Sequence, residues 1–261
     1  MSDPFQPCEK KYKRSLDALK VFAETKYPVI ISTKGRLCIE EPYLSLIREC
    51  NVVMQVSILC SKYDELERGA PPFEERLKIV ETLAQNTQRV ICRAQPYVHD
   101  IFPDMMENVK RFADAGAYGV IFEGMKFAKK KPGLVRSGGD WVQKKELLQS
   151  DFTKLRDECH KHGLRFFAGE NRLRKMGDSL TCCGIEGIEG FTPNTFNLNH
   201  LMNGDITEPT EAQRKPGTAG CFKSIFQTSD MNKVIKESSF EGMIRFVYEN
   251  NRPYVDSVMK G

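Results

Sequence analysis

The sequence predicts an α/β protein built from repeated strand–helix units. Five short runs that are nearly continuous in apolar residues alternate with segments of helical periodicity, a pattern typical of a parallel sheet buried on both faces. No glycine-rich phosphate loop follows the first run, because Val29–Thr33 leads directly into Lys34-Gly35-Arg36-Leu37. The sequence therefore favours a partial (β/α) barrel, with its chemistry at the carboxyl ends of the strands.

Each element rests on a local signal. Apolar positions at helical spacing predict a helix over 9–25, and Pro28 ends it. Pro42 suits the first turn of a helix over 40–48, and Gly116 and Gly163 suit the ends of helices over 104–115 and 142–162. Further helices are expected over 72–83 and 240–248. The expected strands cover 29–33, 52–59, 89–95, 118–122 and 164–168.

The periodic pattern stops near residue 170, where glycine, proline and small polar residues take over. We therefore expect a partial barrel over 1–170 and an irregular extension over 171–261. The net charge of +4 is too small to indicate nucleic-acid binding by itself, which leaves that partner undecided. Lys126–Lys131 fits a solvated loop better than a phosphate-binding loop. No run is long and apolar enough for a membrane span or a signal core, so we expect a cytoplasmic protein.

Nine cysteines suggest reduced thiols, some of which could serve a metal. Four of them lie inside apolar runs and are expected to be buried: Cys38, Cys50, Cys60 and Cys92. Cys182, Cys183 and Cys221 lie instead in the irregular extension and could bind an auxiliary iron–sulfur cluster or zinc, with His200 as a further candidate ligand. Buried or unligated thiols are the alternative, because the spacing matches no standard zinc pattern.

Polar residues stand at the carboxyl end of every expected strand, which favours a small-molecule pocket there. They are Ser32, Thr33, Lys34, Gln55, Ser57, Arg93, Gln95, Glu123 and Glu170. Arg172 and Arg174 follow the last strand and could bind an anionic substrate. Alternatively, Glu170 and Asp178 could neutralise these two arginines within the extension.

Several segments, in the correct order, resemble radical-SAM proteins similar to spore photoproduct lyase. The resemblance covers roughly residues 2–123 and lies in Ser2–Lys10, Pro28–Lys34, Met54–Ser57, Glu65–Leu77 and Cys92–Pro96. It implies a radical-SAM type of barrel that binds S-adenosylmethionine (SAM) through Ser32, Lys34, Gln55, Ser57 and Arg93. It also implies a substrate site at Glu123, Glu170, Arg172 and Arg174.

The sequence departs from this family because it contains no C-x3-C-x2-C motif for the catalytic [4Fe–4S] cluster. We therefore expect the SAM- and substrate-binding portion of a radical-SAM enzyme, a lyase by resemblance. A partner chain or a missing N-terminal segment would supply the cluster and cover an open strand edge at 29–33. The alternative is a non-catalytic barrel that binds a metabolite or a protein. A metal-dependent hydrolase using Glu123 and Glu170 is disfavoured, because no H-x-H pair is present.

Overall fold

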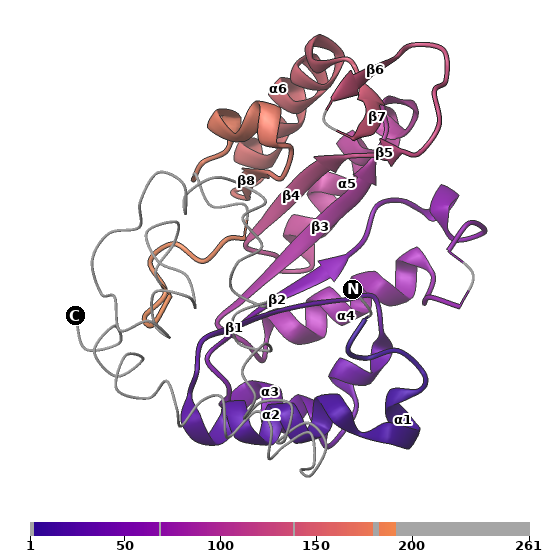
Figure 1. Ribbon diagram of the computed structural model, residues 1–261. Helices are drawn as coiled ribbons and strands as arrows, with labels where there is room; N and C mark the ends of the chain where they lie inside the picture. Colours follow the sequence, from indigo (N-terminus) through magenta and orange to yellow (C-terminus); the bar gives the residue numbers. More distant parts are fainter. Residues whose placement is uncertain (1–2, 68, 138, 180–182, 192–261) are drawn as a thin grey trace, which may run out of the picture.

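The computed structural model describes residues 3–67, 69–137, 139–179 and 183–191, and its central element is a parallel sheet. The strands lie in the order β1-β2-β3-β4-β8, so neighbours in the sheet follow one another along the chain (Figure 1). They are β1 (Val29–Thr33), β2 (Val52–Ser57), β3 (Arg89–Tyr97), β4 (Gly119–Gly124) and β8 (Arg165–Ala168). All four pairings are parallel, which confirms the predicted α/β class.

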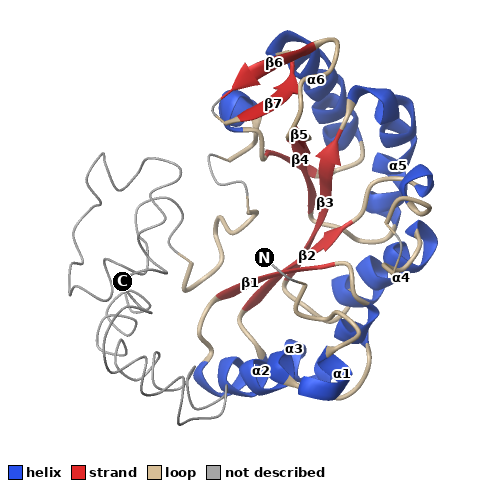
Figure 2. Ribbon diagram, turned by 45° about the vertical axis from the view of Figure 1, so that its right-hand side comes forward, coloured by secondary structure: helices blue, strands red, loops and turns tan. Residues whose placement is uncertain are grey.

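Helices cover one face of the sheet and, apart from the two that precede β1, lie in the connections between its strands (Figure 2). They are α1 (Glu9–Tyr12), α2 (Arg14–Thr25), α3 (Tyr43–Glu49), α4 (Phe73–Ala84), α5 (Phe102–Asp114) and α6 (Lys145–Lys161). Short 3-10 helices are η1 (Arg36–Ile39), η2 (Ser61–Tyr63), η3 (His99–Ile101) and η4 (Asn171–Met176). Right-handed crossovers that all run in one direction along a parallel sheet leave their helices on the same side. The order does not reverse as it does in a doubly wound sheet.

The alternation of side chains along the strands separates two apolar clusters. On the helix side, Val56, Cys92 and Phe122 belong to a large buried core. On the opposite, inner face, Ile91 and Phe167 belong to a smaller core that Ile188 completes. Residues 183–191 therefore cover part of the inner face. The polar residues at the carboxyl ends of the strands do not belong to this apolar core.

The predicted helix over 9–25 is broken at Lys13, whose φ of 52° separates α1 from α2. The break allows the buried carboxylate of Glu9 to accept hydrogen bonds from the backbone N–H of Leu16 and the hydroxyl of Tyr43. A periodic apolar pattern does not reveal this break, because both helices keep similar spacing. The chain therefore forms two helices, with Glu9 hydrogen-bonded between them, where the pattern predicted one.

A second sheet follows β4 and was not predicted. It is antiparallel, in the order β5-β7-β6, and comprises β5 (Lys126–Phe127), β6 (Leu134–Ser137) and β7 (Asp140–Gln143). The expectation that Val142 begins a helix is wrong, since Val142 lies in β7 and α6 begins at Lys145. The prediction of a loop over Lys126–Lys131 is wrong for Lys126 and Phe127, because both pair with β7.

Among the described strands, β1 pairs with β2 alone and is thus an edge of the sheet. Ile30 on this strand is 39% exposed, in contrast to the buried side chains of β2. Within the described residues, no helix has both the length and the apolar character that a membrane span needs. The expected helix over 240–248 and most of the expected extension lie outside the described residues.

Candidate functional site

Ser32 and Gln55 lie side by side on the inner face, in matching register on β1 and β2. The hydroxyl of Ser32 donates to Oε1 of Gln55 at 2.8 Å, and Nε2 of Gln55 donates to the carbonyl oxygen of Cys183 at 3.3 Å. Both side chains are thus engaged with the protein itself. They connect the sheet to the segment that covers its inner face, and they border the strand-end residues described next.

Ser57 and Arg93 form the next level of the inner face, toward the carboxyl ends, where they are register partners on β2 and β3. A terminal nitrogen of Arg93 lies 3.5 Å from Oε2 of Glu123 on β4, and Nζ of Lys126 lies 3.5 Å from Oε1 of the same carboxylate. Nε of Arg93 is buried and has no hydrogen-bond partner in the described part of the chain. This level therefore combines a hydroxyl, a carboxylate and two cations.

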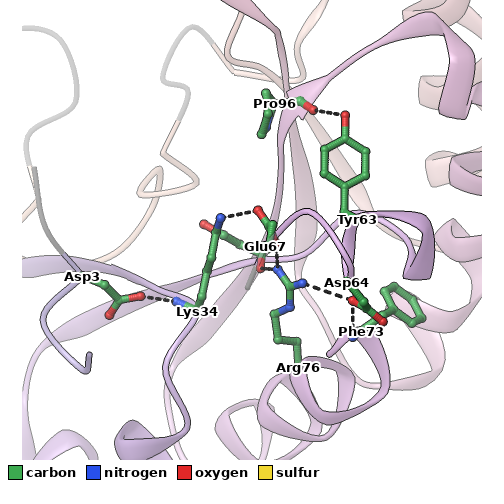
Figure 3. Close-up of polar contacts among 9 residues, drawn as sticks. Asp3, Lys34, Tyr63, Asp64, Glu67, Phe73, Arg76 and Pro96 are labelled. Atoms are coloured by element: carbon green, nitrogen blue, oxygen red, sulfur yellow. Dashed lines mark hydrogen bonds and ion pairs between the residues drawn. The ribbon is translucent and has the colours of Figure 1, made fainter. Parts of the chain in front are cut away.

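Lys34 occupies the carboxyl end of β1 and is tied to the loop that follows β2 (Figure 3). Its ammonium group pairs with Glu67, and its backbone N–H donates to Asp3 at 2.5 Å. Glu67 in turn accepts a hydrogen bond from the buried guanidinium of Arg76 at 2.6 Å. Lys34 thus already has a counter-ion in this structure.

Arg76 joins three parts of the chain beneath this edge (Figure 3). Besides Glu67, its terminal nitrogens contact the carbonyl oxygen of Ser57 at 3.0 Å and Oδ1 of Asp64 at 3.4 Å. Oδ1 of Asp64 also accepts from the backbone N–H of Phe73 at 2.8 Å, at the start of α4. The buried arginine therefore fixes the backbone of Ser57 relative to the loop that carries Glu67.

Glu170 and Arg172 lie at the carboxyl end of β8 and pair with each other. Nε of Arg172 donates to Oε1 of Glu170 at 2.8 Å, and both its terminal nitrogens lie 3.2 Å from the carbonyl oxygen of Gln143. Asp178 contacts His160 and Arg165 instead. The sequence left open whether Arg172 and Arg174 bind an anionic substrate or are neutralised within the chain. In the structure Arg172 forms an ion pair with Glu170. Arg174 lies in the same 3-10 helix, η4.

These expected positions therefore form four groups. Ser32 and Gln55 form one pair on the inner face, and Ser57, Arg93 and Glu123 lie together nearer the carboxyl ends. Lys34 belongs to the network of Arg76, and Glu170 and Arg172 form a separate pair. The sequence analysis did not assign site roles to Glu67, Arg76 or Lys126. The sequence did carry one signal for the Glu67–Arg76 pair: an acidic and a basic residue both follow the second strand. A buried arginine requires an acidic partner, so the two could have been expected to pair.

The four cysteines expected to be buried, Cys38, Cys50, Cys60 and Cys92, are buried. Burial raises the pKa of Cys38 and of Cys50 to about 12, so both are thiols rather than thiolates near neutral pH. Among the residues that the structure describes, no three His, Cys, Asp or Glu side chains gather as metal ligands would. Cys182, Cys221 and His200 lie outside the described residues, which include Cys183.

Comparison with protein families and with curated proteins finds no relative. No family model matches the chain, and no curated protein matches it. The chemistry of the edge thus rests on its own residues: cations at Lys34, Arg93 and Lys126 alternate with carboxylates at Glu67 and Glu123. Such an arrangement can bind a ligand that carries both a carboxylate and an amine, because each group meets the opposite charge.

Proposed function

We propose that the chain is the SAM- and substrate-binding portion of a radical-SAM enzyme similar to spore photoproduct lyase. The single observation that carries the proposal is the level formed by Ser57, Arg93 and Glu123 on the inner face of the sheet. Support also comes from the ordered sequence resemblance over roughly residues 2–123. A parallel sheet with sequential strand order is compatible with a barrel of this type, whose ligands bind at the carboxyl ends of the strands.

The residues at this level fit the amino-acid part of SAM. The guanidinium of Arg93, whose side chain is 27% exposed, suits a carboxylate oxygen, and the carboxylate of Glu123 suits an ammonium group. The hydroxyl of Ser57 has no partner among the described residues and can bond a ribose hydroxyl or the carboxylate. Bound SAM would supply hydrogen-abstraction chemistry once an iron–sulfur cluster had reduced it by one electron. The role of these side chains is to hold and orient it.

The catalytic iron–sulfur cluster fits no set of residues in the described chain, and the sequence has no C-x3-C-x2-C motif. Its ligands would have to come from a partner chain or from a segment beyond this sequence. We also propose that Cys182, Cys183 and Cys221 bind an auxiliary iron–sulfur cluster or zinc. Anaerobic reconstitution of the chain with iron and sulfide tests it, and metal uptake that survives replacement of all three cysteines by serine would contradict it.

Glu170 and Arg172 follow β8, at the other end of the strand order from Lys34 on β1. They would line the part of the site that binds the substrate. Arg172 is held by Glu170 and by the carbonyl oxygen of Gln143, so its guanidinium is rigidly placed. A preorganised group of this kind loses little side-chain entropy when a ligand binds. Arg174 would act beside it on the same 3-10 helix.

One observation favours a second function, a non-catalytic barrel that binds a metabolite or a protein. Lys34 is paired with Glu67, Arg93 with Glu123 and Arg172 with Glu170, so three of the expected ligand-binding cations are compensated internally. A degenerate barrel needs only to retain its fold, and such ion pairs would serve that purpose. The two functions differ in whether the chain binds SAM.

Isothermal titration calorimetry of the full chain with SAM tests the proposal. We expect binding that Arg93→Met weakens by about tenfold or more, since a charge-assisted hydrogen bond is worth about 1.5–3 kcal/mol. Ser57→Ala should weaken it less, because the hydroxyl is neutral. Arg111→Met is the matched control, since Arg111 pairs with Glu74 on the helix side and should leave SAM affinity unchanged. Absence of binding by the unaltered chain would refute the SAM site and favour the non-catalytic function.

A further inference from the structure

Tyr97, His99 and Asp151 form a polar cluster at the carboxyl end of β3 that the site described above does not include. Nδ1 of His99 lies 2.8 Å from Oδ2 of Asp151, and the hydroxyl of Tyr97 donates to the same oxygen at 2.7 Å. The side chain of Asp151 is 4% exposed and comes from α6. A carboxylate this deeply buried requires partners, and these two donors provide them.

The protons of this cluster can be assigned from its hydrogen bonds. Burial, together with the hydrogen bond to Asp151, raises the pKa of Tyr97, so its hydroxyl keeps its proton and donates it. An ionised carboxylate only accepts hydrogen bonds, so Nδ1 of His99 must carry a proton. In the neutral ring Nε2 then holds a lone pair, and Asp151 fixes this tautomer.

The opposite nitrogen of His99 is available for a ligand. The side chain is 45% exposed, and Nε2 has no hydrogen-bond partner among the described residues. The two other histidines in the described part use Nε2 within the protein, His160 with Asp178 and His162 with Glu158, each at 2.9 Å. Of these three, His99 alone combines an oriented ring with an open Nε2. Its ring also stacks on Phe102, with 20° between the ring planes.

Hydrogen bonds connect this cluster to the edge that carries Glu170. The backbone N–H of His99 donates to Oε1 of Gln143 at 3.3 Å, and the carbonyl oxygen of Gln143 accepts from Arg172. Arg172 is the partner of Glu170. His99 thus lies at the same end of the sheet as the strand-end residues, where ligands of parallel sheets bind.

We propose that His99, oriented by Asp151 and Tyr97, is an acid–base site that exchanges a proton with an O–H or N–H group of a small-molecule ligand. Nε2 accepts the proton, the ligand atom keeps the electron pair of the broken bond, and the carboxylate of Asp151 stabilises the imidazolium that forms. The reverse step returns the proton. The site needs neither SAM nor a metal, so its test stands apart from that of the proposed function.

The experiment treats the folded full chain with diethyl pyrocarbonate and follows each histidine separately by peptide mass spectrometry. A deprotonated imidazole nitrogen attacks the reagent's carbonyl carbon as the C–O bond to the ethyl carbonate leaving group breaks. We expect His99 to react faster than His160 and His162, whose Nε2 atoms are engaged. Asp151→Asn should slow His99 by about tenfold or more, because an amide no longer enforces the proton on Nδ1. Glu158→Gln is the matched control and should change His162 alone.

A second measurement keeps the test valid if Asp151→Asn disturbs folding. Long-range ¹H–¹⁵N NMR of the unaltered chain above neutral pH distinguishes the two tautomers directly. We expect His99 in the Nδ1–H form, whereas an exposed histidine without an orienting carboxylate favours Nε2–H. An Nε2–H tautomer, or reaction of His99 no faster than that of His160 and His162, would overturn the proposal.

Discussion

Replacing Arg76 by methionine should destabilise the protein more than replacing any surface arginine. The Arg76 side chain is 1% exposed, and its guanidinium bonds Glu67, Asp64 and the carbonyl oxygen of Ser57. Methionine fills a similar volume but leaves the carbonyl of Ser57 and one oxygen of Glu67 without a partner. Breaking a buried ion pair from one side costs about 3–5 kcal/mol. We expect the lower end, about 3 kcal/mol, because Glu67 keeps its contact with Lys34.

Urea unfolding followed by circular dichroism measures this loss. With a slope of about 1–3 kcal/mol per molar urea, the midpoint should fall by about 1–3 M. Arg111→Met is the matched control, since Arg111 pairs with the exposed Glu74, and it should cost about 1 kcal/mol or less. The double variant Glu67→Gln/Arg76→Met should lose less than the sum of the single losses, because it leaves no uncompensated buried charge. A loss at Arg76 no larger than that at Arg111 would refute the reasoning.

Two further predictions concern the buried thiols of Cys38 and Cys50 and the segment 183–191 that covers part of the inner face. Burial raises the pKa of Cys38 and Cys50 from 9.0 to about 12, so the folded state holds protons that the unfolded state loses. Stability should therefore fall as pH rises from 9 toward 12, by about 1.4 kcal/mol per thiol and pH unit, and urea midpoints for Cys50→Ala should fall less steeply. Arg89→Met should speed proteolysis within residues 183–191, because Arg89 bonds the carbonyl oxygens of Gly184 and Glu186. Arg136→Met, on the small sheet, is its control, and equal cleavage rates would show that Arg89 does not hold the segment.

The parallel sheet could be predicted because most residues of its strands are apolar. The runs at 29–33, 52–59, 89–95, 118–122 and 164–168 each overlap an observed strand, with ends that differ by at most two residues. A short apolar run between two helical patterns is a strong local signal of such a strand. The small sheet escaped prediction because β5 has two residues and β6 is largely exposed, so neither carries an apolar run.

The candidate site could be predicted as a set of strand ends but not as a set of contacts. The position of Ser57 and Arg93 on adjacent strands follows from the order of the elements. The ion pairs of the nearby residues could not be predicted in this way. Lys34 pairs with Glu67 and Arg172 with Glu170 because of loop conformations that no periodic pattern encodes. The orientation of His99 by Asp151 joins residues that lie 52 positions apart, and an isolated histidine in a sequence gives no sign of it.

The order of the strands also has a consequence for how the chain folds. From β1 to β4 each new strand docks against the strand made just before it, so these contacts form locally and can assemble while the chain is still being synthesised. Strand β8 pairs with β4 across the intervening residues 125–164. This connection is longer than those between the earlier strands of the sheet, so closing it costs more entropy. The sheet should therefore grow from its amino-terminal edge, with the docking of β8 as its last step and β4 as its temporary edge until then.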